Sequence, residues 1–382
     1  MTEKESALHS QYIIDGIICD ATPAELLNEC MSDPAKDPAD GQVFADIIDE
    51  STDPPVSSFT YDNSRDIAYA AQCAAASAKE RPFRMLYPDA FTRLRIADCL
   101  IERIWNDGHF RLGDLEIWAR WTWNTRPLGN MAAFHKSAEA AGEYIFGLGI
   151  RMNDYIFEET DEESHTGFYA WLPEGRNEED DYEVRFKESP FESHHPWISE
   201  SRKCPAEIIA DPASWLIYIP FDTCSYSIGG SLLAQLHGHN GGPGLHIQDP
   251  DYFIDCFEVV RELVEDGIVM SGATVSDGGL GTAAAMICGG KGIELDISGL
   301  MSSHQEKDTT KMLFSEVPGV LLQISDNDYD YLDSQLLLQD VAYYPVGHPS
   351  AGFSGIRLIN RKKADVAGIL ASLLEQASEG ED

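Results

Sequence analysis

Basic residues are scarce in this chain: 27 Lys and Arg stand against 65 Asp and Glu among 382 residues, a net charge of −38. Such a negative surface repels phosphate backbones and anionic lipid headgroups. The scarcity argues against nucleic acid and membrane as partners, and a bound phosphate would need local help from backbone amides. We interpret the acidic excess first as a solvated surface suited to salt, with a face for a basic partner as the alternative.

Long apolar runs and paired cysteines are missing too. No stretch approaches the length that crosses a bilayer, and the opening MTEKESALHSQ lacks the basic start and apolar centre of an export signal. We therefore expect a cytoplasmic protein. No Cys-x-x-Cys pair occurs among the eight cysteines, which argues against a zinc site or a redox dithiol and favours reduced, buried thiols.

Composition and patterning predict three regions. Residues 1–90 are acidic and rich in Asp, Pro and Ser, so we expect an irregular N-terminal extension with a few short helices and no chemistry. Residues 91–205 are expected to form a first lobe. Within it, an apolar stripe over 134–148 predicts a helix, and the acidic segment 158–200 predicts an irregular surface excursion. Residues 206–382 are expected to form a second lobe.

The second lobe has the clearest elements. A strand is predicted over Trp215–Phe221, and a helix is predicted after Asp249 as N-cap, with Pro250 in its first turn and Gly267 at its end. The strand-like runs IELDI and VLLQI follow, and then a last amphipathic helix around 366–373. Strands and helices mix without a strict βαβ rhythm, so the predicted fold class is α+β.

Two glycine turns, IGGSLLAQ at 228–235 and SDGGL at 276–280, are the candidate binding site. In each, glycines can adopt positive φ and bring N–H groups close to an anion, and a helix start adds a favourable dipole. Taken alone, each turn equally suits a plain connection into a helix, with Asp277 as an N-cap. The predicted nucleotide- or phosphate-binding residues are Gly229, Gly230, Ser231, Ser276, Asp277, Gly278 and Gly279.

The order of the segments is more specific than any one of them. IGGSLLAQ, PDYFIDCFEVVRELVEDG, VSDGGL, GIELDIS and LFSEVPGVLLQIS follow one another over 215–347. In this order they closely resemble the last lobe of the phosphoribosylformylglycinamidine synthase (FGAM synthase, PurL) family. Glu316 and Gly319 stand where that family has its acid and glycine. The resemblance implies a two-lobed architecture like that of aminoimidazole ribonucleotide (AIR) synthetase, the PurM-like fold, and corresponds to the second such half of the synthase.

The first lobe is similar to the family more distantly, and it departs from the family pattern. The segment Trp121–Ile150 looks like part of the second half of the large synthases. Gly129-Asn130-Met131 replaces the family's Gly-Glu-Asp turn, and RMNDYIF (151–157) replaces its Gly-Lys-Asp-Ser turn, with Asp154 as a remnant. A carboxylate that could hold Mg²⁺ is therefore missing, and no catalytic or metal-binding residue is assigned.

Three further features have plain interpretations. ESHHP (192–196) resembles the Glu-Thr-His-Asn-His-Pro motif of the synthase's catalytic half, but it lies in the acidic excursion, so chance is preferred. His237, His239 and His246 lack the spacing of a helical metal site and indicate an exposed loop. The tryptophans of WARWTW (118–123) indicate core packing rather than a base-stacking platform.

The resemblance implies ATP-dependent amidation of formylglycinamide ribonucleotide, with ATP and Mg²⁺ as cofactors if the chain is active. It implies a nucleotide or phosphorylated small molecule as ligand, and a homodimer or a synthase or glutaminase subunit as partner. Two alternatives stay open: a catalytically inactive paralogue that acts as a binding or assembly partner, and another ATP-dependent kinase or synthetase of the superfamily. Whether the chain is a C–N-forming ligase also stays open.

Overall fold

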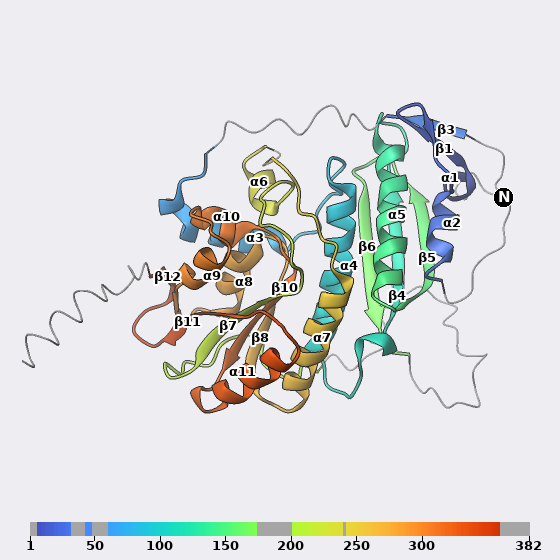
Figure 1. The fold of residues 1–382 in the computed structure, drawn as a ribbon. Coiled ribbons are helices and arrows are strands. Elements are labelled where there is room, and N and C mark those ends of the chain that lie inside the picture. Colours follow the sequence, from blue (N-terminus) through green and yellow to red (C-terminus); the bar gives the residue numbers. More distant parts are fainter. Residues whose placement is uncertain (1–5, 32–42, 48–59, 174–200, 240–241, 360–382) are drawn as a thin grey trace, which may run out of the picture.

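The computed structural model describes residues 6–31, 43–47, 60–173, 201–239 and 242–359. These residues form two lobes, each built on its own sheet, with a small third sheet from the N-terminal segment (Figure 1). The predicted α+β class is confirmed. The last helix expected around 366–373 and the string ESHHP lie outside the described residues. Among the described residues, no helix is both long and apolar enough to cross a membrane.

The first lobe has a three-stranded sheet covered by two long helices. Its order is β5-β4-β6, in which β5 (Arg151–Glu159) is parallel and β6 (His165–Trp171) antiparallel to the central β4 (Glu116–Trp123). Helices α4 (Pro88–Ile104) and α5 (Asn130–Gly147) pack together beside this sheet (Figure 1). The side chains of all three tryptophans of β4 are buried, so the core interpretation is confirmed.

Strand β6 is a correction to the sequence analysis, which placed 158–200 in an irregular excursion. The run HTGFYAW is surrounded by acidic residues that hide it in composition, yet it pairs with β4 from Glu116↔Trp171 to Thr122↔His165. Aromatic and β-branched side chains favour such a pleated, half-buried surface.

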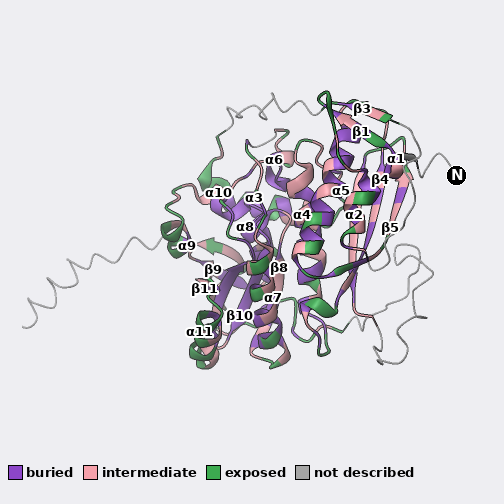
Figure 2. Ribbon diagram, turned by 45° about the vertical axis from the view of Figure 1, so that its right-hand side comes forward, coloured by how far each residue is buried: buried purple, intermediate pink, exposed green. Residues whose placement is uncertain are grey.

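The second lobe has a six-stranded sheet of order β12-β9-β11-β7-β10-β8, with apolar residues on both faces of its central strands. Ile217 and Ile219 face the core that holds α7, whereas Leu216 and Tyr218 face the core that holds α8, because successive strand residues alternate sides. Figure 2 shows the resulting buried layer. The strands are β7 (Trp215–Pro220), β8 (Val269–Val275), β9 (Gly292–Leu295), β10 (Gly319–Ile324), β11 (Tyr344–Ser350) and β12 (Gly355–Leu358).

The predicted helix after Asp249 is confirmed as α7 (Pro250–Glu265). Asp249 accepts a hydrogen bond from the Tyr252 amide, and Gly267 follows the helix with φ 73°. The core that α7 shares with α4 and α5 runs through both lobes. The other helices of this lobe are α6 (Leu232–Leu236), α8 (Gly279–Ile287), α9 (Ser298–Ser303), α10 (Thr309–Phe314) and α11 (Tyr329–Leu338).

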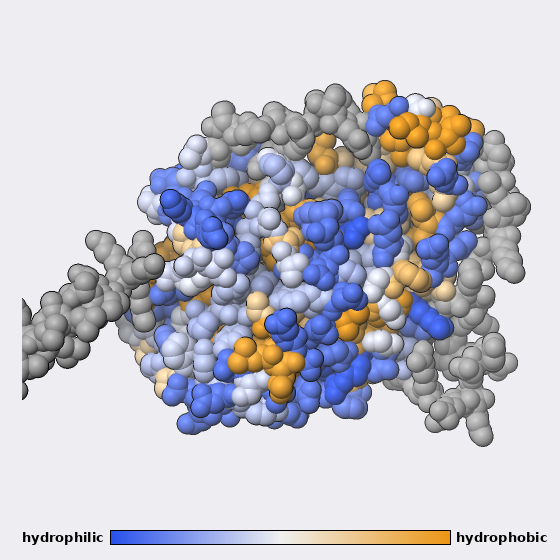
Figure 3. Space-filling model, in the orientation of Figure 1, coloured by the Kyte–Doolittle hydropathy of each residue, from blue (hydrophilic) through white to orange (hydrophobic). Residues whose placement is uncertain are grey.

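The N-terminal segment contributes to both lobes. Strands β2 (Ile17–Ile18), β1 (Gln11–Ile14) and β3 (Val43–Asp46) form a small sheet beside α5, and α3 (Asp66–Ser77) packs on α8. Apolar side chains lie exposed on this sheet, and Figure 3 shows the orange patch at its end of the molecule. The short helices here are α1 (Ser6–His9) and α2 (Pro23–Asn28). The division at residues 90 and 205 stays a prediction.

Candidate functional site

The two predicted glycine turns meet at one buried carboxylate. Glu316 Oε1 accepts a hydrogen bond from the Gly278 amide of the SDGGL turn (2.8 Å) and from the Leu232 amide that follows the IGGS turn (2.6 Å). Gly278 has a φ of 75° and Gly230 a φ of 71°, and both positive values allow this close approach. Residues with a Cβ rarely adopt such φ angles. Turns that are about fifty residues apart in sequence are therefore joined through one carboxylate.

A buried arginine lies between these turns. Arg81 Nη1 donates to Asp277 Oδ1 and to Glu316 Oε1 (3.2 Å), and its Nη2 donates to the Gly230 carbonyl (3.5 Å). Its side chain is only 3% exposed. Burial lowers the pKa of Arg81, but the charges of Glu316 and Asp277 outweigh it, so the net pKa is raised. The guanidinium therefore stays charged and fills the position where an external cation would meet these carboxylates.

Asp277 uses its second oxygen as well. Arg95 Nη2 on α4 donates to Asp277 Oδ2 (2.9 Å), so both carboxylate oxygens are bound by arginines. The alternative reading of Asp277 as an N-cap is wrong, because Gly278, in a left-handed conformation, is the N-cap of α8 and no side chain caps it. The acid of the SDGGL turn thus belongs to an ion-pair network rather than to the helix end.

The IGGS turn faces the chain's own side chains. A Cβ on Gly230 would lie 2.7 Å from the Tyr87 ring, so the ring packs directly on this glycine. The Tyr87 hydroxyl donates to the Gly242 carbonyl (2.6 Å), and Arg84 donates to the Ser231 carbonyl (3.1 Å). Ser231 caps α6 through its hydroxyl. A cavity of only about 20 Å³ remains beside Gly229 and Gly230.

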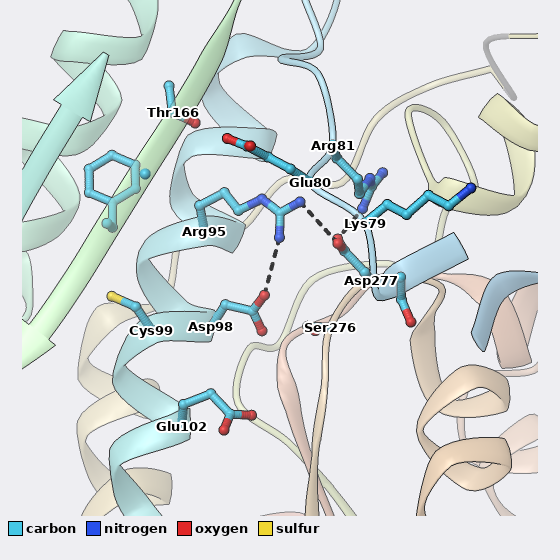
Figure 4. Close-up of a pocket in the computed structure, with 13 residues that line it drawn as sticks. Lys79, Glu80, Arg81, Arg95, Asp98, Cys99, Glu102, Thr166, Ser276 and Asp277 are labelled. Atoms are coloured by element: carbon cyan, nitrogen blue, oxygen red, sulfur yellow. Dashed lines mark hydrogen bonds and ion pairs between the residues drawn. The ribbon is translucent and has the colours of Figure 1, made fainter. Parts of the chain in front are cut away.

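A larger pocket of about 410 Å³ opens between α4 and the SDGGL turn (Figure 4). Of the seven predicted residues, Ser276 and Asp277 line it, whereas Gly278 and Gly279 lie behind them at the start of α8. Its other charged lining residues are Lys79, Glu80, Arg81, Arg95, Asp98 and Glu102.

Most of this lining was not predicted from the sequence. Lys79 and Arg81 fall in the segment where no chemistry was expected. On α4 the signal was present, because Arg95, Asp98 and Glu102 recur at spacings of three and four and so share one helix face. Only the tertiary structure turns that face towards the SDGGL turn rather than towards solvent.

Asp98 is the titratable group of this pocket. Burial, followed by the nearby charge of Asp277, raises its pKa to about 7, although Arg95 and a hydrogen bond with Ser276 act in the opposite direction. Arg95 Nη1 lies 3.4 Å from Asp98 Oδ2, and the Asp98 side chain is 19% exposed. Burial likewise raises the pKa of the Cys99 thiol, which makes it a poor nucleophile.

The described residues do not fit a Mg²⁺ ion. Across the described ranges, no three His, Cys, Asp or Glu side chains are grouped so that they could hold a metal. Asp277, the obvious oxygen donor, already has an arginine on each oxygen. Magnesium needs near-octahedral oxygen ligands, usually one or two free carboxylates plus substrate phosphates.

The turn Gly129-Asn130-Met131 lacks the acids of the family pattern. A carboxylate from another segment of the chain binds to it instead. Asp46 of β3 accepts hydrogen bonds from the amides of Gly129 (2.7 Å), Met131 (2.9 Å) and Ala132 (3.1 Å) at the start of α5. This carboxylate satisfies the helix N-terminus, where N–H groups would otherwise lack partners.

The histidine loop packs against the N-terminal segment rather than standing free. Tyr61 Oη lies 3.0 Å from His239 Nε2, and the His237 ring contacts the Tyr69 ring edge-on. Burial lowers the pKa of His239, so its imidazole is neutral over a wider pH range. This arrangement is a packing contact between segments.

Comparison with known proteins finds sequence similarity to one family model and to synthases. Residues 223–339 match the model of the family described as AIR synthase related protein, C-terminal domain. A probable phosphoribosylformylglycinamidine synthase, chloroplastic/mitochondrial, of Arabidopsis thaliana is 26% identical over 292 residues, which is 74% of this chain and 20% of the relative. The human phosphoribosylformylglycinamidine synthase is 28% identical over 115 residues, 30% of this chain and 8% of the relative.

Comparison with solved structures finds similarity at TM-scores below 0.5. Thermotoga maritima PurL complexed with FGAR has a TM-score of 0.49 at 10% identity, covering 72% of this chain and 41% of that one. Escherichia coli HypE has a TM-score of 0.42 at 14% identity, covering 71% of this chain and 76% of that one.

The second lobe thus contains an AIR synthase-related C-terminal domain. The similarity to the plant synthase extends beyond this domain and over 74% of the chain. It spans about a fifth of the length of the plant relative.

Proposed function

We propose that this PurL-like chain binds a phosphorylated small molecule, nucleotides such as ATP included, in the pocket between α4 and the SDGGL turn, without Mg²⁺-dependent amidation. Its volume of about 410 Å³ is in the range of small-molecule sites. Lys79 and Arg95 supply cationic donors, and Ser276 supplies a hydroxyl. These groups bind phosphate oxygens in proteins, and they support this ligand class despite the chain's net charge of −38.

One observation supports the absence of Mg²⁺-dependent amidation. Arginines bind both oxygens of Asp277. Phosphoryl transfer to an amide oxygen needs a metal to offset the charge on the transferring group. A carboxylate that is held by two guanidinium groups is not available to that metal. The proposal thus favours the catalytically inactive paralogue, with a role in purine biosynthesis through binding or assembly.

A second candidate function is ATP-dependent amidation of formylglycinamide ribonucleotide itself. It is favoured by the similarity to the plant synthase over 292 residues. The chain covers about a fifth of that relative, and this function would also need a glutaminase activity that delivers ammonia. We also propose that the chain forms a homodimer or binds a synthase or glutaminase partner. Its proposed location is the cytoplasm.

Calorimetry followed by a product assay separates the two candidates. We expect the purified chain to bind ATP with equal affinity with and without Mg²⁺, and to release no ADP with formylglycinamide ribonucleotide and ammonium. Arg95→Gln should weaken ATP binding about tenfold, or about 1.4 kcal/mol. The matched control is Arg93→Gln on the same helix, whose partners Asp89 and Glu143 lie outside the pocket.

Each outcome decides between the candidates. ADP release that depends on formylglycinamide ribonucleotide would establish the enzyme, and ADP release with another small molecule would favour a kinase or synthetase of the superfamily. No ATP binding by the wild-type chain would remove the nucleotide part of the proposal. Equal loss in the Arg93 and Arg95 variants would place the ligand elsewhere.

A further inference from the structure

The side chain of Arg81 meets oxygen atoms from three separate segments of the second lobe. Its Nη1 donates to Asp277 Oδ1, beside which Figure 4 shows it, and to Glu316 Oε1 at 3.2 Å. Its Nη2 donates to the Gly230 carbonyl at 3.5 Å. Two carboxylates and one backbone carbonyl are also the kind of ligands that surround hard divalent cations in proteins.

The guanidinium is only partly matched by these acceptors. The Arg81 side chain is 3% exposed, yet its Nε–H has no hydrogen-bond partner among the described residues. A buried donor without an acceptor destabilises the folded state, so it calls for an explanation. The surrounding oxygens thus match the positive charge of Arg81 more completely than they match its planar group of five donors.

The two acids depend on Arg81 for their charge balance. Among the described residues, Arg81 is the one cation that binds both Asp277 and Glu316. Arg95 binds Asp277 as well, but it is shared with Asp98, whose Oδ2 lies 3.4 Å from Arg95 Nη1. Without Arg81, two buried carboxylates would be left close together with part of one arginine. Such a pair takes up a proton or binds another cation.

We propose that the Arg81 guanidinium is a built-in replacement for a divalent cation, which joins the SDGGL and IGGS turns without a metal and keeps metal ions out of this position. This inference rests on the proposed function, in which Mg²⁺-dependent amidation is absent, and adds the residue that takes the place of the ion. A bound divalent cation is often the largest local charge of a site, and here a side chain of the chain itself supplies the positive charge.

The inference implies a latent metal site beneath Arg81. Removal of this side chain would free Asp277, Glu316 and the Gly230 carbonyl for an external ion. The space left behind would open into the pocket of about 410 Å³, because Arg81 and Asp277 both line that pocket. An ion could therefore enter together with its water molecules. Mg²⁺ and Mn²⁺ suit such a site, since they accept one or two carboxylates and keep several waters.

Manganese binding to Arg81 variants tests this inference. Mn²⁺ prefers the same oxygen ligands as Mg²⁺, and electron paramagnetic resonance measures its free concentration. We expect Arg81→Ala to bind one Mn²⁺ per chain at least about tenfold more tightly than the wild type does. At constant ionic strength, Mn²⁺ should raise the Tm of Arg81→Ala more than that of the wild type, and EDTA should abolish the difference.

The matched control is Arg93→Gln, which removes the same charge from an arginine whose partners Asp89 and Glu143 are exposed. It should bind Mn²⁺ as the wild type does. Arg81→Lys keeps a cation between the two acids and should gain no metal either. Adding Asp277→Asn to Arg81→Ala should remove the gained site. If Arg81→Ala does not fold, Arg81→Gln gives the same comparison, because its amide still donates to one carboxylate.

Each outcome decides the matter. Folded Arg81→Ala or Arg81→Gln that binds Mn²⁺ no better than the wild type overturns the inference and leaves the proposed function standing. The same holds for an equal gain in Arg93→Gln, which would report net charge alone, and for two Arg81 variants that stay unfolded even with Mn²⁺. If the wild type itself binds Mn²⁺ tightly and Asp277→Asn abolishes this, the inference fails together with the metal-free part of the proposed function.

Discussion

Arg81 is the residue on which the site's geometry depends. Its guanidinium neutralises two carboxylates that lie in the interior, and removing one partner of a buried pair typically costs about 3–5 kcal/mol. We predict that Arg81→Met lowers the free energy of unfolding by an amount in this range, measured by urea denaturation at neutral pH. The methionine keeps the apolar stem, so the loss reports the charge rather than the volume.

The control for this prediction is Arg93→Gln, because the carboxylates that pair with Arg93 are 44% and 61% exposed. An exposed pair contributes about 1 kcal/mol or less, so this variant should unfold close to the wild type. Similar losses in both variants would show that the buried position of Arg81 has no special role. Folding of the control would also show that losing an arginine is tolerated in itself.

At the scale of elements, Asp46 joins the small N-terminal sheet to α5. Its carboxylate binds three amides at the helix start, and its side chain is buried. We predict that Asp46→Ala lowers the free energy of unfolding by about 2 kcal/mol, the upper range for loss of a helix N-cap. Amide hydrogen exchange should become faster at Met131 and Ala132, because their N–H groups lose their acceptor.

The variant Asp46→Asn is the milder comparison, since an amide oxygen still accepts a hydrogen bond although the favourable charge at the helix N-terminus is lost. It should fall between the wild type and Asp46→Ala. Unchanged exchange at the start of α5 in the alanine variant would mean that another group satisfies these amides. The same result would also show that α5 stays stable without its link to the small sheet.

At the scale of the whole molecule, the charge of −38 opposes the compact state through self-repulsion. Salt shortens the Debye length from about 10 Å at 0.1 M to about 3 Å at 1 M. We predict that the Tm rises by several degrees over this range, measured by circular dichroism. Sodium and potassium chloride should act alike, because screening depends on ionic strength. A Tm that falls with added salt would show that attractive ion pairs outweigh the repulsion.

Much of the second lobe follows from local patterns. Helix α7 is an example, with its apolar stripe, its cap at Asp249 and its end at Gly267. These features depend on residues close together in sequence, so local backbone energetics determine them. The glycine pairs were also visible, because only a residue without a Cβ takes positive φ readily. The hidden strand β6 shows the limit, since its partner β4 lies more than forty residues away.

The sequence by itself determined the α+β class, the helical stripes, the glycine turns and the negative surface, since each depends on composition or on short-range spacing. Only the tertiary structure decided that Arg81 neutralises Asp277, 196 residues further along, and that Asp46 caps a helix in another part of the chain. Such pairs produce no periodic pattern in the sequence, because the two partners come into contact only in the folded structure. The physical reason is that Coulomb and hydrogen-bond partners are chosen by distance in space, which the folded core sets.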